Sequence, residues 1–125
     1  MRLLLDTHIL LWWLQDSREL VREARALIEA PDHLVYVSAA SVWEVAIKAA
    51  IGKIRIDLAA FDAAVGASMF TPLSIAARHA IAAAQLPPLH RDPFDRMLVA
   101  QSQAEGLQIV THDPVIARYG PALVM

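Results

Sequence analysis

The chain has no cysteine among its 125 residues, which excludes disulfide scaffolds, zinc fingers, iron–sulfur sites and thiol nucleophiles. A reducing compartment is compatible with this absence, and we expect a cytoplasmic protein. An excess of positive charge is also missing, because 11 lysines and arginines stand against 13 aspartates and glutamates. The net charge of -2 disfavours nucleic-acid binding by bulk charge, so local cations would have to meet any polyanion.

Long uncharged runs are missing too. Asp6 interrupts the first apolar run, and Glu44 with Lys48 interrupts the second, so no stretch approaches the roughly 18 residues of a membrane span. Asp6 also argues against a signal peptide at the start. Yet 57% of the residues are hydrophobic, above the usual share of about 45 to 50%. We interpret this surplus as a face that a partner covers. The length of the chain predicts one domain, spanning residues 1–125.

Apolar runs and helix signals alternate along the chain. Short apolar runs predict strands at 3–5, 34–37, 70–73, 107–110 and 122–124. Helices are predicted at 7–14, from a cap at Ser17 to Ile28, from Ser38 or Ser41 to Gly52, from Asp57 to Met69, at 75–84, and from Asp92 to Glu105. Strands separated by helices require crossovers, so we expect an α/β fold whose parallel sheet carries helices on both faces.

The acidic residues fall where a parallel sheet collects its ligands, beyond the carboxyl ends of the strands. Asp6 directly follows the first predicted strand, and Asp113 stands just past the fourth. Glu44 lies in the helix after the second strand, while Asp92 and Asp95 open the helix that leads to the fourth. We therefore expect these carboxylates to gather at one edge of the sheet.

Glu44 also has a purely structural interpretation. Ser41 and Glu44 have the spacing of a capping box, and Glu44 with Lys48 suits an exposed ion pair one helical turn apart. On a helical wheel, however, Glu44 shares its side with Ile47 and Ile51. We therefore place Glu44 among packed side chains, where a surface ion pair is less expected.

The other acids suit helix starts when each is taken alone. Asp6 and Asp92 suit N-caps, and Asp95 suits a helix dipole. Four ionised carboxylates about 6 Å apart, however, repel one another by roughly 15 to 20 kcal/mol. That exceeds the stability of most domains, so the cluster has to take up protons or hold a cation. Oxygen ligands favour Mg²⁺ or Mn²⁺, and such ions suit phosphodiester hydrolysis.

Competing site motifs are absent. The histidines form no H-E-x-x-H zinc motif, and we interpret His90 and His112, which flank acids, as loop residues without a catalytic part. The chain has no Walker A loop, no G-x-G-x-x-G and no G-x-S-x-G. Nucleotide hydrolysis, dinucleotide binding and serine hydrolase chemistry therefore have no support.

Four segments in order resemble the motifs of PIN-domain ribonucleases: LLLDTH at 3–8, SVWEVAIK at 41–48, HRDPFDRMLVAQ at 90–101 and VTHD at 110–113. The whole chain resembles the VapC toxins of type II toxin–antitoxin systems. This resemblance implies a PIN-like three-layer αβα fold with a short, mostly parallel central sheet. It also implies an endoribonuclease that depends on Mg²⁺, with Mn²⁺ as the alternative ion. Such a toxin is inhibited by a VapB-like antitoxin, and we expect a homodimer or a toxin–antitoxin hetero-oligomer.

The resemblance places the metal-binding and catalytic acids at Asp6, Glu44, Asp95 and Asp113. We prefer Asp95 to Asp92 because the family pattern sets its acid just before an apolar run, here at 98–100. Further residues beside the ligands are Asp92, Thr7 and Thr111, of which the threonines equally suit strand-end caps. Candidate RNA-binding residues are Lys48, Arg91 and Arg96, with Lys53 and Arg55 as further cations.

Three alternatives remain open from the sequence. The chain could be a catalytically inactive PIN-fold binding module, whose acids cap helices and pair with nearby cations. A haloacid dehalogenase-type phosphatase also starts with a strand that ends in Asp, but Asp6-Thr7-His8 lacks the second acid of its D-x-D motif. Cleavage of DNA is the third alternative, because carboxylate-bound metals do not distinguish sugars.

The tryptophans bear on a partner. Trp12 and Trp13 are adjacent and point about 100° apart on a helix, so both cannot easily face one core. We expect one of them to contact an antitoxin or a second subunit.

Overall fold

A computed structural model describes all 125 residues. The strands are β1 (Arg2–Leu5), β2 (Leu34–Ser38), β3 (Thr71–Leu73), β4 (Gln108–Thr111) and β5 (Ala122–Val124). The helices are α1 (Thr7–Leu14), α2 (Arg22–Glu29), α3 (Ala39–Ala50), α4 (Leu58–Ala67), α5 (Ala77–Gln85), α6 (Pro93–Glu105) and α7 (Pro114–Ala117). None of these helices combines the length and the apolar composition that crossing a bilayer requires.

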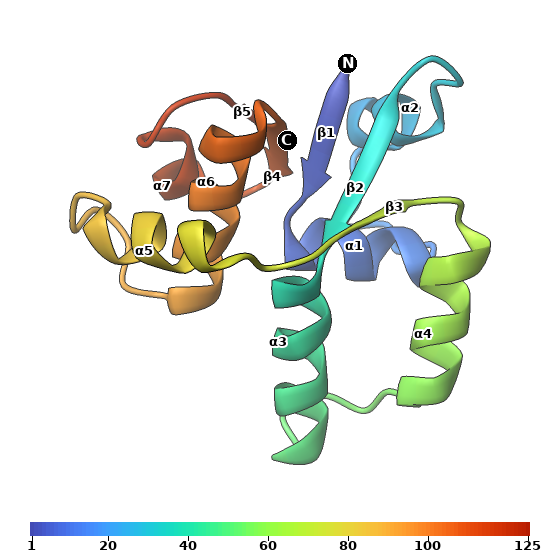
Figure 1. Cartoon of the computed structure of the whole chain (residues 1–125). Coiled ribbons are helices and arrows are strands. Elements are labelled where there is room, and N and C mark those ends of the chain that lie inside the picture. The colour runs from blue at the N-terminus through green and yellow to red at the C-terminus, as the bar shows by residue number, and fades with distance from the viewer.

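The strands form one sheet in the order β3-β2-β1-β4-β5, and every neighbouring pair is parallel. Figure 1 shows α1, α2 and α4 on one side of β1 and β2, and α5, α6 and α7 on the other, with α3 extending beyond the end of β2. The expected three-layer αβα architecture with a parallel central sheet is confirmed.

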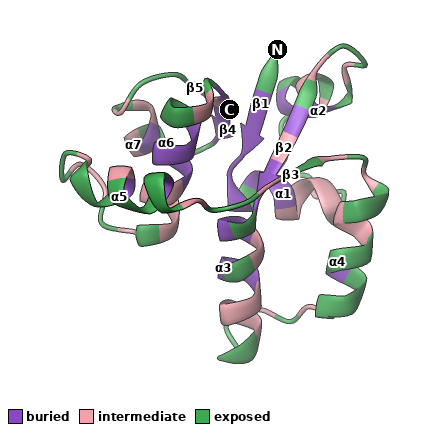
Figure 2. Ribbon diagram, viewed as in Figure 1, coloured by how far each residue is buried: buried purple, intermediate pink, exposed green.

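Alternation along β1 builds a core on each face of the sheet. Leu3 and Leu5 pack with residues of α1, α2 and α4, whereas Leu4 packs with α6 and α7. All three leucines are fully buried, and Figure 2 shows that the buried residues concentrate in β1, β2 and α6. A continuous apolar run is what a strand covered on both faces requires.

Helix starts follow the sequence signals at most positions. Ser38, Asp57 and Asp92 are the N-caps of α3, α4 and α6, and each accepts a hydrogen bond from an amide of the first helical turn. The helix expected from Ser17 instead begins at Arg22. Ser17 accepts a hydrogen bond from the amide of Glu19 within a turn that precedes α2. This hydrogen bond caps the turn and does not start a helix.

The short helix α7 is absent from the sequence-based expectation. Asp113 caps it by accepting from the amide of Val115, and Pro114 occupies its first position. The same Asp-Pro pair starts α6 at Asp92, so the signal was present. No long apolar periodicity follows Pro114, because α7 is a single turn.

The packing of β1 makes a stability prediction. Leu4→Ala should lower the free energy of unfolding by roughly 2 to 5 kcal/mol, because Leu4 is fully buried and its removal leaves a cavity. Leu34→Ala is the matched control on the neighbouring strand, where the side chain is half exposed. Urea unfolding of both variants tests this, and equal losses would contradict the two-faced core.

Candidate metal centre

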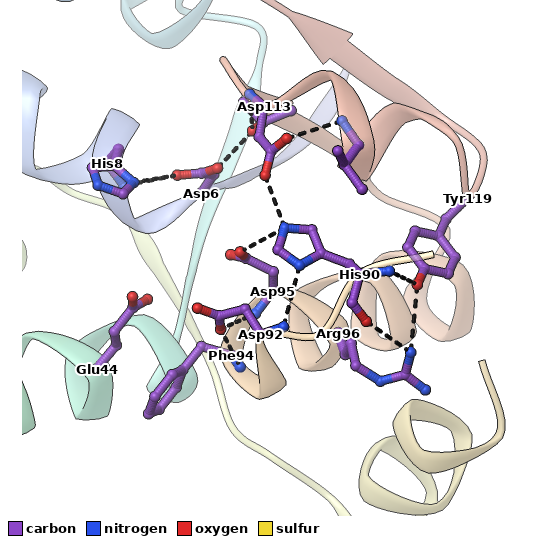
Figure 3. A network of polar contacts seen from close by, with 12 residues as sticks. Asp6, His8, Glu44, His90, Asp92, Phe94, Asp95, Arg96, Asp113 and Tyr119 are labelled. Atoms are coloured by element: carbon purple, nitrogen blue, oxygen red, sulfur yellow. Dashed lines mark hydrogen bonds and ion pairs between the residues drawn. The ribbon is translucent and has the colours of Figure 1, made fainter. Parts of the chain in front are cut away.

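The carboxyl ends of β1, β2 and β4 meet at one edge of the sheet, and the helices that follow them begin there. This arrangement brings Asp6, Glu44, Asp95 and Asp113 into one region, although they are far apart in the sequence. Figure 3 shows the carboxylates of Asp6, Glu44, Asp92 and Asp95 pointing toward a common space. The structure therefore gathers all the acids that the sequence singled out.

Asp6 is buried and fixed by two hydrogen bonds. Its Oδ1 accepts from the amide of His8 at 2.7 Å, as an N-cap of α1 does, and its Oδ2 accepts from the hydroxyl of Thr111 at 2.6 Å. The Thr111 hydroxyl in turn accepts from the amide of Asp113 at 3.0 Å. Thr111 therefore connects the acids that follow β1 and β4, while Thr7 donates to Ser41 at 3.0 Å.

Glu44 is buried and also forms an ion pair. Its Oε2 lies 2.8 Å from Nζ of Lys48, and this hydrogen bond raises the pKa of Lys48. Burial and ion pairing, which the sequence presents as alternatives, occur together at Glu44. The alternative interpretation of Ser41 and Glu44 as a capping box does not hold, because α3 begins after Ser38 and Ser41 lies inside it. The other oxygen of Glu44, Oε1, is buried without a hydrogen-bond partner.

Asp92 and Asp95 have different tasks although they share one helix turn. Oδ1 of Asp92 accepts from the amides of Phe94 at 2.8 Å and Asp95 at 3.2 Å, so Asp92 is the N-cap of α6. The Asp95 side chain instead points toward the other acids. Burial and the negative charges of Asp92, Asp6 and Glu44 together raise the pKa of Asp95 to about 7, against an opposing effect of His90.

His90 connects two of the acids, a contact that the sequence analysis did not include. Its Nε2 lies 2.9 Å from Oδ2 of Asp113 and 3.1 Å from Oδ2 of Asp95 (Figure 3). His90, Asp95 and Asp113 form the tightest group of potential metal ligands in the chain. Burial acts to raise the pKa of Asp113, but hydrogen bonds from His90 and the Val115 amide hold it below its usual value.

No local pattern identifies His90, because its partners are five and 23 positions away and meet it only in the folded chain. His112, in contrast, makes no hydrogen bond to an acid and packs its ring against Trp12 at 4.8 Å between centroids. Both histidines lie in loops as expected, and His90 in addition contacts two acids of the site.

The candidate RNA-binding cations separate into different groups. Arg96 donates from both terminal nitrogens to the carbonyl oxygens of Ala83, Leu86, Pro87 and His90. These bonds tie the loop before α6 to the end of α5, and they leave those nitrogens no hydrogen for a phosphate. We therefore withdraw Arg96 as an RNA ligand. Lys48 is paired with Glu44, whereas Arg91 is exposed beside the acids.

The donor set fits a hard divalent cation. The site offers carboxylate oxygens from four separate segments and one imidazole nitrogen. The unpartnered Oε1 of Glu44 and the raised pKa of Asp95 both indicate negative charge that the protein's own cations leave uncompensated. Oxygen-rich sites of this kind suit Mg²⁺ or Mn²⁺.

A family model described as the PIN domain matches residues 3–121, and the chain belongs to this family. Several solved structures share the fold at low sequence identity. VapBC2 from Rickettsia felis bound to a DNA fragment from its promoter matches with a TM-score of 0.70 at 13% identity, covering 100% of this chain and 98% of that chain.

A toxin–antitoxin complex from Klebsiella pneumoniae matches with a TM-score of 0.71 at 21% identity, covering 97% of this chain and 95% of that chain. FitAcB from Neisseria gonorrhoeae matches with a TM-score of 0.64 at 16% identity, covering 97% and 96% of the two chains. No curated protein matches the sequence. These likenesses establish the fold, and the chemistry of the site has to come from its own residues.

Asp95 makes a pH-dependent prediction. Its pKa in the folded protein is raised, so its ionisation opposes folding, and this destabilisation of the metal-free protein grows as the pH rises from about 4 to about 7. Asp95→Asn should therefore stabilise the chelator-treated protein by a few kcal/mol more at pH 8 than at pH 4.5. Urea unfolding at both pH values measures this. Asp32→Asn, at an exposed carboxylate outside the site, is the control, and an equal effect of both variants would contradict the crowding.

Proposed function

We propose that this chain is a metal-dependent endoribonuclease toxin of the cytoplasm that a cognate antitoxin neutralises. The observation that carries the proposal is the meeting of Asp6, Glu44, Asp95 and Asp113 at the carboxyl edge of the sheet, in a chain of the PIN family. The similar solved structures include a toxin–antitoxin complex and VapBC2, and they support the assignment to toxins.

In this proposal Asp6, Asp95 and Asp113 hold Mg²⁺ or Mn²⁺, and Glu44 offers its free Oε1 from the opposite helix. When bound, the ion activates water and stabilises the departing oxygen of a phosphodiester. The remaining residues orient these acids. Thr111 holds Asp6, and Lys48 holds one oxygen of Glu44 so that the other faces the site.

Aromatic rings beside the acids support a nucleic-acid substrate with unpaired bases. His8, Trp12 and His112 lie together next to Asp6 and Asp113, with ring centroids 4.8 to 6.0 Å apart. Beside Glu44 and Asp95, Trp43 packs edge-on against Phe94 at 5.3 Å, and Trp43 is 60% exposed. Exposed rings at a polar site are suitable platforms for bases, and single-stranded RNA offers bases that are free to stack.

An apolar groove supports the antitoxin partner. It lies between α3, α4 and β3, has a volume of about 570 Å³, and is lined by Val42, Trp43, Ala46, Val65, Gly66 and Phe70. Trp43 at this groove is the most exposed tryptophan, whereas Trp13 packs against Phe70 and Trp12 against His112. The expected contact of Trp12 or Trp13 with a partner therefore moves to Trp43 in our proposal, with an apolar segment of the antitoxin in the groove.

Loss of one acid tests the nuclease. Asp6→Asn should abolish cleavage of total RNA in Mg²⁺, because it removes a charged ligand from the proposed centre. The melting temperature should stay unchanged or rise, since the Thr111 hydroxyl can accept from the new amide and like-charge repulsion falls. Wild-type protein with a chelator and Asp32→Asn with Mg²⁺ are the controls. Unchanged cleavage by Asp6→Asn would defeat the assignment.

The products identify the reaction and the substrate. In-line attack by water should leave 5′-phosphate and 3′-hydroxyl ends, which end mapping detects. A parallel digestion of single-stranded DNA of the same sequence tests the alternative substrate. If DNA were cleaved as fast as RNA, specificity for RNA would be rejected, whereas metal-dependent nuclease activity would still be supported.

Gly66 allows a sharp test of the groove, because a Cβ at this position meets no atom within 4 Å. Gly66→Glu should weaken inhibition by the protein that the neighbouring reading frame encodes by at least about tenfold, since it places an unpaired charge in an apolar contact. Gly66→Ala should be inhibited normally, and both variants should cleave RNA like the wild type. Normal inhibition of Gly66→Glu would place the antitoxin elsewhere.

A further inference from the structure

His90 has one ring nitrogen that lies beside two acids of the site. Its Nε2 lies within hydrogen-bond distance of Asp113 at 2.9 Å and Asp95 at 3.1 Å, and the side chains involved are largely buried. The two carboxylate oxygens belong to the residues that we propose as metal ligands. His90 therefore occupies the position between them that a shared cation would take.

The other ring nitrogen decides whether His90 donates or binds metal. Nδ1 of His90 accepts a hydrogen bond from the amide of Asp92 at 3.2 Å. A nitrogen that accepts has no proton, so a neutral ring carries its proton on Nε2. That proton then forms the hydrogen bond to Oδ2 of Asp113, while Oδ2 of Asp95 lies 3.1 Å from the same nitrogen. Coordination of a metal through Nε2 would require the proton to move to Nδ1, where it would face the amide hydrogen of Asp92.

The backbone of His90 is anchored independently of the acids. Its amide donates to the hydroxyl of Tyr119 at 2.7 Å, and its carbonyl accepts from Arg96 at 3.2 Å. The Tyr119 hydroxyl donates to the carbonyl of Pro87 at 2.7 Å. The imidazole is thus presented to the acids by a loop that Arg96 of α6 and Tyr119, which follows α7, hold in place. Its position does not depend on attraction to the carboxylates alone.

We propose that His90 is a positioning residue that competes with the divalent cation for Asp95 and Asp113, so that loading of the metal centre requires its Nε2–H to leave these oxygens. This inference rests on the metal centre of the proposed function. The distances alone would also allow His90 to be a further metal ligand. The proposal assigns it the opposite role, that of a competitor of the metal. In the metal-free protein, His90 holds the two carboxylates together and offsets their repulsion.

Mn²⁺ binding by the whole chain distinguishes these roles without any substrate. Titration calorimetry at pH 8 should show that His90→Ala binds Mn²⁺ about tenfold more tightly than the wild type, which corresponds to about 1.4 kcal/mol. The metal-free variant should melt at a lower temperature, and saturating Mn²⁺ should reduce that difference. A merely structural role would lower the melting temperature without tightening Mn²⁺ binding. Weaker or equal binding by His90→Ala would overturn the proposal.

His90→Gln is the conservative variant, because its amide nitrogen stands where Nε2 stands and keeps a donor there. Its Mn²⁺ affinity should return toward the wild-type value. His33→Ala is the control, since His33 contacts the carbonyl of Leu27 and no acid of the site, and it should bind Mn²⁺ like the wild type. An affinity of His90→Gln equal to that of His90→Ala would also overturn the competition.

The outcome separates this inference from the proposed function. Tighter Mn²⁺ binding by His90→Ala without RNA cleavage by the wild type would uphold the competition and reject the ribonuclease. Metal-dependent RNA cleavage with unchanged Mn²⁺ affinity in His90→Ala would uphold the ribonuclease and reject the competition. Absence of Mn²⁺ binding in both proteins would reject the metal centre and the competition with it.

Discussion

Repulsion between carboxylates at the edge of the sheet is the constraint on which the rest of this structure depends. A parallel sheet directs the ends of β1, β2 and β4 to one side, and each of the following helices brings an acid to that side. Charges of one sign held this close are costly in a partly buried site. The raised pKa of Asp95 is the direct expression of that cost, because burial and the neighbouring acids both oppose its ionisation.

The chain compensates this charge with a different partner for each acid. Asp6 takes a backbone amide and the Thr111 hydroxyl, and Glu44 takes Lys48 on one oxygen only. Asp113 receives an amide at the start of α7 and shares His90 with Asp95. The compensation is incomplete at Oε1 of Glu44 and at Asp95, and these are the two points where the site has most to gain from a divalent cation.

Membership of the PIN family and the likeness to solved structures fix the fold, but at 13 to 21% identity they leave the site to be argued from this chain. The contacts in this chain change the roles of individual residues. Arg96, which had the charge expected of an RNA ligand, joins the loop before α6 to α5 instead. That loop carries His90, which contacts Asp95 and Asp113. Arg96 therefore influences the position of these acids instead of binding the substrate.

Sequence signals predicted the elements well wherever the signal is local. The apolar run of β1 and the caps at Ser38, Asp57 and Asp92 depend on neighbours within one helical turn, and the structure confirms them. The helix start predicted at Ser17 was wrong, because a serine that caps a turn makes the same local hydrogen bond without a helix following it. The tight pair of helix-start residues at Asp113 and Pro114 was missed because α7 is too short to show a periodicity.

The sequence by itself determined that acids follow the buried strands, because strand ends and helix caps are set by residues a few positions apart. Only the tertiary structure decided which groups those acids contact. His90 meets Asp113 across 23 positions, and Thr111 meets Asp6 across 105, through the pairing of β1 with β4. A hydrogen bond has a range of about 3 Å, so its partners are known only when the folded chain has fixed their positions.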